Sequence, residues 1–303
     1  MRILVADGMD KKAMELLRSE GHEVVEFACP QEELGATMRE YDAVVVRSRS
    51  KVRAAEIDAA KGSRMKVVIR GGVGVDNIDV EYAEANGIAV RNTPKASTES
   101  VAEIAIAHMF SCARHVSAAT CSMREGKWEK KAFGDAIELY GKTLGVIGFG
   151  RIGQRVAAMA KGIGMNILAN DIYQVPGLEE QMGMKYVDLD TLLAQSDFIS
   201  LHVPAINGVK LITAETIAKM KDGVVFINTS RGNNVDEDDL LAALNSGKIR
   251  AAGLDVFMDE PTHNMALCSH PNVSCTPHLG GGTKEAQGRI GMEIVEIIRS
   301  FAK

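Results

Sequence analysis

The sequence has no excess of positive charge, no long apolar run and no paired cysteine motif. Its 40 acidic side chains outnumber 35 basic ones, and this balance gives no electrostatic footprint for nucleic acid or an anionic membrane surface. No apolar run approaches the about 20 residues of a membrane span, and the apolar stretch in residues 1–7 is too short for a signal peptide. We therefore expect small-molecule partners, no nucleic acid, no membrane, and a cytoplasmic location.

The five cysteines are odd in number, form no C-x-x-C pair and lack the spacing of metal ligands. We interpret them as reduced side chains without a chemical role, since a buried cysteine behaves as a small apolar residue. A redox-sensitive thiol among them is the alternative. No metal site is expected.

Short apolar runs alternate with amphipathic stretches along all 303 residues, the pattern of parallel sheets covered by helices on both faces. Because this length exceeds the size at which one core stops growing, we expect two domains. The expected strands of the first domain share short β-branched runs bounded by turn residues. They are 3–6, 23–27, 43–46, 66–69 and 88–90.

A long apolar-periodic stretch at residues 97–125 predicts a helix that bridges the two domains, with Ser100 to Glu103 as a capping box. A second series of strands then completes a doubly wound sheet. These strands are expected at 144–147, 167–169, 185–187, 198–201, 224–227, 251–256 and 273–275. The last stretch, from Thr283, has its apolar residues on one helical face. We expect it to return to the first domain, which would comprise residues 1–93 and 283–303, with 94–282 as the second domain.

The segment from Gly148 to Gly153 reads G-x-G-x-x-G, with Arg151 and Ile152 between the last two glycines. It directly follows an apolar strand and precedes a helical run. In this context the first glycine allows a tight turn, the second lets the backbone approach a pyrophosphate, and the third lets the helix pack on the strand. A structural strand-to-helix turn is the alternative interpretation.

Asp171 stands at the end of the next expected strand, where a carboxylate accepts hydrogen bonds from ribose hydroxyls. A carboxylate there would repel a 2'-phosphate, and the following Ile172 and Tyr173 offer no arginine to receive one. The sequence therefore predicts NAD as the cofactor. A second glycine segment, Gly71 to Asn77, lacks the third glycine, so it is either a backbone nest for an anion or a plain turn.

Three polar residues follow strands of the second domain, namely Arg231, Glu260 and His278. Because ligands bind at the carboxyl ends of parallel strands, these side chains could converge on one substrate. Arginine grips a carboxylate with two hydrogen bonds, imidazole exchanges a proton near neutral pH, and a carboxylate orients and charges the imidazole. Each residue alone has a plain structural alternative. The remaining histidines are interpreted as structural or surface groups, and they include His108, His115, His202, His263 and His270.

Taken together, these segments resemble the D-2-hydroxyacid dehydrogenase family, on the motifs Asn228 to Gly232, Asp255 to Pro261 and Thr276 to Gly280. The resemblance implies an α/β fold of two doubly wound parallel-sheet domains, a Rossmann NAD-binding domain and a smaller flavodoxin-like substrate domain. It implies that Arg231, Glu260 and His278 are catalytic and that Thr229 and Asp255 lie near the nicotinamide. It also implies a homodimer, with residues 97–140 as an arm against the partner.

Within the family, several segments are most similar to the branch that oxidises 3-phosphoglycerate in serine synthesis. They are residues 46–52, 72–77, 126–133 and 278–287. The resemblance implies substrate contacts by a set of residues from three segments. They are Arg47, Ser48, Gly72, Val73, Gly74 and Lys130. A phosphorylated 2-hydroxy acid needs more cationic donors than a plain one, and Arg47 and Lys130 could supply them. Arg49 is interpreted as a solvated cation.

Two alternatives to this function stay open at the level of sequence. One is a related dehydrogenase acting on glyoxylate, hydroxypyruvate or D-lactate, and the other is a dinucleotide-sensing corepressor-like protein, because fold alone does not fix function. Many members of the phosphoglycerate branch carry C-terminal regulatory domains. Because the sequence ends at Lys303, we expect no serine feedback through such a domain.

Overall fold

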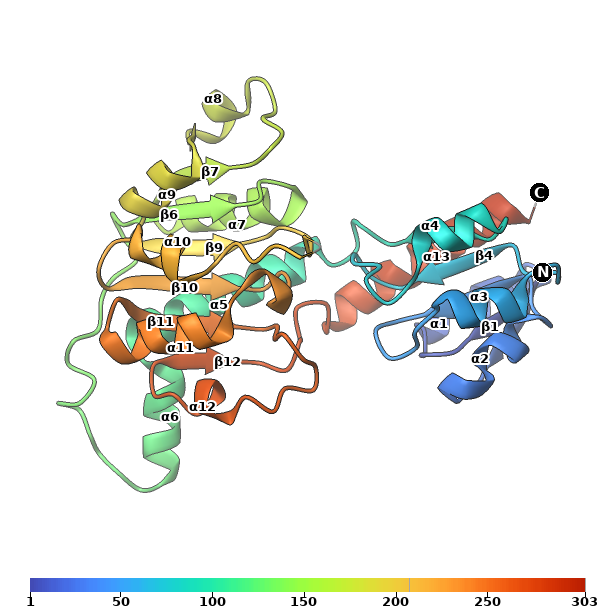
Figure 1. Ribbon diagram of the computed structural model, residues 1–303, viewed down its shortest axis with the longest axis horizontal. Coiled ribbons are helices and arrows are strands. Elements are labelled where there is room, and N and C mark those ends of the chain that lie inside the picture. Colours follow the sequence, from blue (N-terminus) through green and yellow to red (C-terminus); the bar gives the residue numbers. More distant parts are fainter. Residues whose placement is uncertain (207, 303) are drawn as a thin grey trace. The chain divides into compact units, whose positions relative to one another are not determined.

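The computed structural model describes residues 1–206 and 208–302, and the chain divides into two compact units. Unit 1 combines Met1–Ser97 with the chain from Gly281 onward, and unit 2 is Thr98–Gly280. Each unit is a parallel sheet with helices on both faces (Figure 1). The expected fold class of two parallel α/β sheets is therefore confirmed.

The sheet of unit 1 has five parallel strands in the order β2-β1-β3-β4-β5. Its strands are β1 Arg2–Val5, β2 Glu23–Glu26, β3 Ala43–Val46, β4 Val67–Arg70 and β5 Ala89–Asn92. Strand β2 lies on one side of β1, whereas β3 and the later strands lie on its other side. The switch point of this sheet is therefore between β1 and β3. This order is that of flavodoxin-like sheets.

Five helices cover the two faces of this sheet. They are α1 Lys11–Ser19, α2 Gln31–Met38, α3 Ala54–Ala60, α4 Val80–Ala85 and α13 Lys284–Phe301. The core on one face joins α2, α3 and α4 to the sheet through Leu34, Ile57 and Ala83. On the other face, α13 packs beside α1 and buries Ile290 and Ile294. The final apolar stripe of the sequence thus completes the core of unit 1.

The sheet of unit 2 has seven parallel strands in the order β12-β11-β10-β9-β6-β7-β8. Its strands are β6 Thr143–Ile147, β7 Asn166–Asn170, β8 Lys185–Tyr186, β9 Phe198–Leu201, β10 Val224–Asn228, β11 Ile249–Leu254 and β12 Val273–Cys275. The switch point lies between β6 and β9. This is the doubly wound arrangement of dinucleotide-binding domains.

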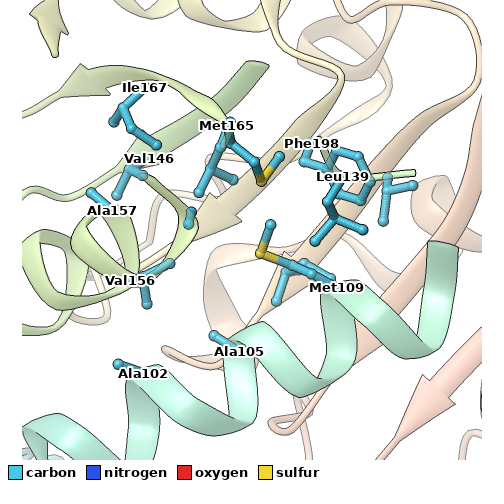
Figure 2. Close-up of a cluster of buried hydrophobic side chains, with 14 of the residues drawn as sticks. Ala102, Ala105, Met109, Leu139, Val146, Val156, Ala157, Met165, Ile167 and Phe198 are labelled. Atoms are coloured by element: carbon cyan, nitrogen blue, oxygen red, sulfur yellow. The ribbon is translucent and has the colours of Figure 1, made fainter. Parts of the chain in front are cut away.

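The helices of unit 2 flank both faces of the sheet, with a 3₁₀ turn at Gly232–Asn234. They are α5 Thr98–Arg114, α6 Val116–Arg124, α7 Arg151–Gly162, α8 Leu178–Met182, α9 Leu189–Gln195, α10 Ala214–Ala218, α11 Glu237–Ser246 and α12 Met265–Cys268. Small residues such as Ala102 and Ala157 let α5 and α7 approach the sheet, and Met109 and Phe198 fill the space between them (Figure 2). None of the described helices has the length and apolar composition that a membrane crossing needs.

The long helix expected over residues 97–125 is instead two helices, α5 and α6. His115 separates them with a left-handed backbone at φ 53°, a conformation uncommon for a residue other than glycine. The predicted capping box is also wrong. Helix α5 begins at Thr98, so Ser100 lies buried inside its first turn rather than before it.

Candidate active site

The carboxyl ends of β6 and β9 meet at the switch point of unit 2, and Gly148 and His202 follow these strands. Gly148 adopts φ +89°, and a Cβ there would lie 2.7 Å from the carbonyl carbon of His202. At Gly153 a Cβ would lie 2.1 Å from the oxygen of Gly148. Only glycine therefore fits these two positions of the turn.

Beside Gly150, by contrast, an added Cβ would meet open space. Helix α7 starts directly after it, and no side chain caps the helix. The first-turn amides, including those of Arg151 and Ile152, thus keep the unpaired donors and the positive dipole end of a helix N-terminus. Both features fit a pyrophosphate group.

Asp171 follows β7 and is joined to the glycine turn. The amide of Phe149 donates to Asp171 Oδ2 over 2.6 Å, and the amide of Tyr173 donates to Oδ1 over 2.9 Å. Each carboxylate oxygen has a further lone pair, which fits the acceptor that a ribose hydroxyl needs. The exposed side chains of Ile172 and Tyr173 beside it carry no cation for a 2'-phosphate.

Two buried polar atoms near the same edge have no hydrogen-bond partner among the described residues: Thr229 Oγ1 after β10 and His202 Nδ1 after β9. Burial lowers the pKa of His202 to about 3, so its ring is neutral at physiological pH. Buried polar atoms without partners are costly, and a bound polar ligand would satisfy them. Thr229 was expected near the nicotinamide, whereas His202 was interpreted as structural.

Asp255 follows β11 and is 1% exposed, yet its carboxylate is well bonded. The Thr276 hydroxyl and the Leu279 amide donate to Oδ1 over 2.6 and 2.7 Å, and the Gly280 amide donates to Oδ2 over 2.8 Å. The amide of His278 donates to the Asp255 carbonyl over 2.9 Å. Asp255 thus holds the turn that carries His278, a role the sequence did not suggest.

Glu260 and His278 form a direct pair, with Glu260 Oε2 2.6 Å from His278 Nδ1. Their side chains are 37% and 38% exposed, so solvent reaches both. Burial alone would raise the pKa of the Glu260 carboxyl. The hydrogen bond and charge of His278, the Phe257 amide and the charge of Arg231 outweigh it and hold that pKa below its ordinary value. Glu260 is therefore a carboxylate that fixes the orientation of the ring.

Arg231 lies in the turn after β10, which the side chain of Asn228 shapes. Asn228 Nδ2 donates to the Arg231 carbonyl over 3.0 Å, and its Oδ1 accepts from the amide and hydroxyl of Ser230. Because β10, β11 and β12 are adjacent parallel strands, their carboxyl ends share one edge of the sheet, and Arg231, Glu260 and His278 follow these ends. The arrangement can hold a carboxylate and move a proton beside it.

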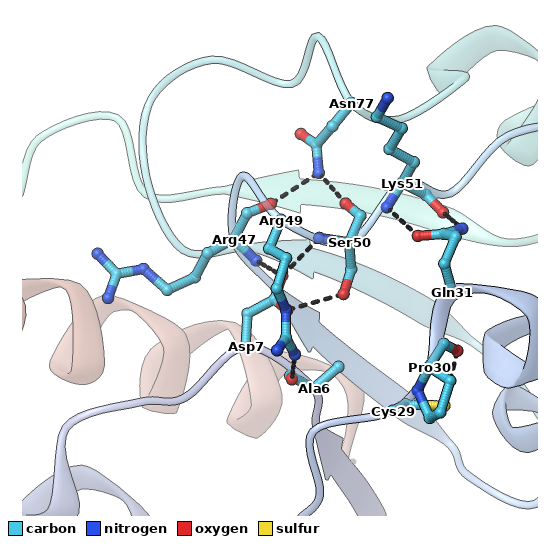
Figure 3. Close-up of polar contacts among 10 residues, drawn as sticks. All are labelled: Ala6, Asp7, Cys29, Pro30, Gln31, Arg47, Arg49, Ser50, Lys51 and Asn77. Atoms are coloured by element: carbon cyan, nitrogen blue, oxygen red, sulfur yellow. Dashed lines mark hydrogen bonds and ion pairs between the residues drawn. The ribbon is translucent and has the colours of Figure 1, made fainter. Parts of the chain in front are cut away.

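In unit 1, the switch point between β1 and β3 is organised by Asp7 (Figure 3). Its carboxylate accepts from the Arg47 amide over 2.7 Å, the Ser50 hydroxyl over 2.7 Å and Arg49 Nε over 3.0 Å. These bonds outweigh burial, which alone would raise the pKa of Asp7, and lower it. Asn77 Nδ2 donates to the carbonyls of Arg47 and Ser50 and fixes the same loop.

The guanidinium of Arg47 points away from this cluster (Figure 3). Burial lowers its pKa against the opposing charge of Asp7, and no hydrogen-bond partner is found for it among the described residues. The residues Arg47 and Ser48 line a cavity of about 300 Å³, together with Asp7, Glu26 and Arg49. The side chain of Arg49 is 60% exposed, as expected of a solvated cation, and it also binds Asp7 Oδ1 and the Ala6 carbonyl.

The other expected substrate residues are backbone groups and one exposed cation. Gly72 is buried, and its carbonyl accepts from Thr93, while the amides of Val73 and Gly74 make no hydrogen bond within the described chain. These two amides fit the anion nest that the sequence left open. Lys130 is fully at the surface of unit 2, in the loop after α6. Among the described residues, no group of three metal-ligating side chains lies together.

Comparison with known proteins agrees with this geometry. A sequence profile described as "D-isomer specific 2-hydroxyacid dehydrogenase, NAD binding domain" matches residues 106–280. The chain is 50% identical over 302 residues to the hydroxypyruvate reductase of Thermotoga maritima, with 98% of this chain and 97% of that protein covered.

It is 46% identical over 306 residues to the D-3-phosphoglycerate dehydrogenase of Archaeoglobus fulgidus, and it covers only 58% of that longer protein. The D-lactate dehydrogenase of Aquifex aeolicus, solved with NAD and lactic acid, superposes with a TM-score of 0.86 at 30% identity, covering 100% of this chain and 95% of that one. The chain therefore belongs to the D-isomer specific 2-hydroxyacid dehydrogenase family, and its second unit carries the family's NAD-binding domain.

Proposed function

We propose that the protein oxidises 3-phosphoglycerate to 3-phosphohydroxypyruvate with NAD, the first step of serine biosynthesis. The observation that carries the choice of substrate is Arg47. Its side chain is partly buried and its guanidinium points away from Asp7, whose carboxylate binds Arg49 and Ser50 instead. A partly buried cation without a paired carboxylate favours an anionic ligand, and arginine matches a phosphate with two parallel hydrogen bonds.

In the proposed reaction, Arg231 binds the substrate carboxylate and polarises the neighbouring oxygen. His278 removes the proton of the 2-hydroxyl group. Because Glu260 engages Nδ1, His278 Nε2 is the nitrogen left for this exchange. The hydrogen on C2 leaves with its electron pair, and NAD, when bound, supplies the acceptor for that hydride. In the reverse direction His278 returns its proton to the keto oxygen.

The remaining residues bind and orient. The amides of Val73 and Gly74 suit the substrate carboxylate, and the exposed Lys130 would make a looser contact to the phosphate than arginine does. The turn from Gly148 to Gly153 and the carboxylate of Asp171 hold the pyrophosphate and ribose of NAD. Asp255 and Thr229 lie at the strand ends that would border the nicotinamide.

A second candidate is hydroxypyruvate reductase, because the Thermotoga maritima relative of that name matches nearly the full length of both chains. Both substrates share the same carboxylate and carbon skeleton, so the same trio would serve either. They differ in the phosphate, which is the group assigned to Arg47.

Steady-state rates on a panel of acids distinguish these functions. The panel comprises 3-phosphoglycerate, phosphohydroxypyruvate, hydroxypyruvate, glyoxylate, pyruvate and D-lactate. We expect kcat/KM for phosphohydroxypyruvate to exceed that for hydroxypyruvate by at least about tenfold, the value of one charge-assisted hydrogen bond. A preference for hydroxypyruvate or glyoxylate would overturn the choice of substrate. NAD binding without turnover on any acid would favour a dinucleotide-sensing role.

We also propose a homodimer through the arm at residues 97–140. Trp128, Met123 and Val116 are 81%, 54% and 51% exposed there, and several exposed large apolar side chains in one segment favour an interaction surface. Sedimentation equilibrium should give twice the chain mass of 32.6 kDa for the native protein. The double variant M123K/W128K should sediment as one chain, whereas the matched M292K variant on α13 should not change the mass. A native protein of single-chain mass would contradict the dimer.

A further inference from the structure

A buried hydrogen-bond network of polar side chains leads from α5 to the turn that carries His278. His108, on α5, is only 3% exposed. Its Nδ1 lies 3.0 Å from Ser274 Oγ on β12, and its Nε2 lies 3.0 Å from Thr276 Oγ1. The Thr276 hydroxyl in turn lies 2.6 Å from Asp255 Oδ1. His108 and Thr276 thus connect a helix in the core to the carboxylate that holds the His278 turn.

Counting the available protons fixes which group donates and which accepts in each hydrogen bond of this network. An ionised Asp255 only accepts, so the single hydroxyl proton of Thr276 is donated to it. Thr276 Oγ1 must therefore accept from His108 Nε2–H. Burial lowers the pKa of His108 against the charge of Asp255, which keeps the ring neutral, so its Nδ1 accepts from Ser274. Ser117 Oγ lies 3.2 Å from Ser274 Oγ and supplies the next hydroxyl.

Burying this hydrogen-bond network has a desolvation cost. An imidazole and two hydroxyls occupy a place between helix and sheet where apolar side chains pack without desolvation cost. Fully satisfied networks of this kind specify one arrangement of the groups they connect. Here the connected group is Asp255, which binds the amides of Leu279 and Gly280.

The turn that Asp255 holds is itself strained. His278 adopts φ 51°, in the left-handed region that is unfavourable for a residue with a side chain. Such a backbone persists only when its surroundings fix it. The hydrogen bonds of Asp255 to both sides of His278 provide that constraint, and Thr276 fixes the carboxylate itself.

We infer that His108 is a positioning residue for the proposed proton-transfer group His278, acting through Thr276 and Asp255. His108 touches neither substrate nor cofactor. It holds Thr276 as a donor, so that Asp255 keeps the orientation in which it binds the 278–280 turn. This inference rests on the proposed function of His278.

The test compares three substitutions of His108 in the full-length protein. The amide of glutamine reaches the place of Nε2 and can donate to Thr276, whereas the amide of asparagine reaches only the place of Nδ1. Leucine fills the space without either bond. We expect H108L and H108N to lower kcat about tenfold or more, with unchanged Kd for NAD, because small displacements of a reacting group reduce rate strongly. H108Q should restore kcat to within about threefold of the native value.

A second measurement tests the route through Thr276. In a double-mutant cycle of H108L with T276V, the two losses in kcat should be far from multiplicative, because both variants break the same path. Multiplicative losses would overturn the route. Equal losses in all three His108 variants, or rates within about twofold of native in all three, would overturn the positioning role.

The variant H278A separates this inference from the proposed function. If H278A is inactive while the His108 variants are unaffected, only the positioning role fails. If H278A retains turnover, the proposed role of His278 fails, and the inference about His108 fails with it.

Discussion

The switch points of the two sheets offer different chemical groups, although both lie at the carboxyl edge of a doubly wound sheet. In unit 2 the edge after β6 is a glycine turn that offers backbone amides and a helix N-terminus. In unit 1 the edge after β1 and β3 offers side-chain ions, with Asp7 at the centre and Arg47 pointing away from it.

This difference matches two kinds of anion. The pyrophosphate of NAD suits a turn of backbone amides that excludes side chains. The phosphate of the proposed substrate suits a cation on a side chain, whose position its neighbours set. Asp7 binds the side chain of Arg49 and the backbone of Arg47 but not the guanidinium of Arg47, to which we assign the phosphate in the proposed function. The same architecture thus acquires its chemistry from a few residues at strand ends.

The largest effect is expected when proton transfer in unit 2 is abolished while the glycine turn that binds the cofactor stays intact. H278A should lower kcat about 1000-fold, within the range that general acid–base catalysis contributes. Its Kd for NAD should stay unchanged, because His278 belongs to a different strand end from the glycine turn. Stopped-flow turnover and fluorescence titration with NAD measure the two quantities. H263A, which removes an exposed histidine of the same unit, is the control, and a loss below tenfold in H278A would contradict the role.

The next largest effect is expected when cofactor binding is weakened while the proposed catalytic residues stay intact. D171N should raise the Kd for NAD about tenfold or more, since a charged hydrogen-bond acceptor for ribose is lost. Its discrimination against NADP should also fall, because the repulsion of a 2'-phosphate goes with the charge. Calorimetric titration of both dinucleotides checks this, with D190N at an exposed position as the control. Unchanged affinity for both would show that Asp171 only fastens the Phe149 amide.

A smaller effect concerns pH. The lowered pKa of Glu260 keeps it ionised near neutrality, where its Oε2 engages His278 Nδ1 and fixes the ring. As the pH falls through this lowered pKa, the carboxyl group gains a proton and the charge-assisted hydrogen bond is lost, so kcat in the reductive direction should decline at acid pH. In E260Q the side chain has no such titration, so this acid decline should be absent. The pH dependence of kcat in both proteins measures it, and the same acid decline in E260Q would contradict the pairing.

Much of the fold could be predicted because buried parallel strands are continuous apolar runs. Every expected strand exists, and its ends lie within two residues of the expected ones. The glycine turn and Asp171 were also visible, since a backbone cradle demands glycine at fixed spacing. The break at His115 was not visible, because neither glycine nor proline marks it, and the capping pattern at Ser100 competed with an earlier helix start.

The side-chain clusters were harder to predict for a physical reason. Asp7 and Arg47 come together only because β1 pairs with β3, and Asp255 meets Thr276 only because β11 pairs with β12. His108 is separated by 166 residues from Ser274, its partner. A histidine on the apolar face of a helix looks structural until strand order is known. Charge alone therefore could not distinguish Arg47 from Arg49.

The most direct test of the comparison is the substrate selectivity of these two arginines. The measurement is the ratio of kcat/KM for phosphohydroxypyruvate to that for hydroxypyruvate in R47A and R49A. If Arg47 is the phosphate ligand of unit 1, R47A should lower this ratio about tenfold or more, and R49A, whose charge Asp7 already neutralises, should leave it within about twofold. An unchanged ratio in R47A would contradict the account.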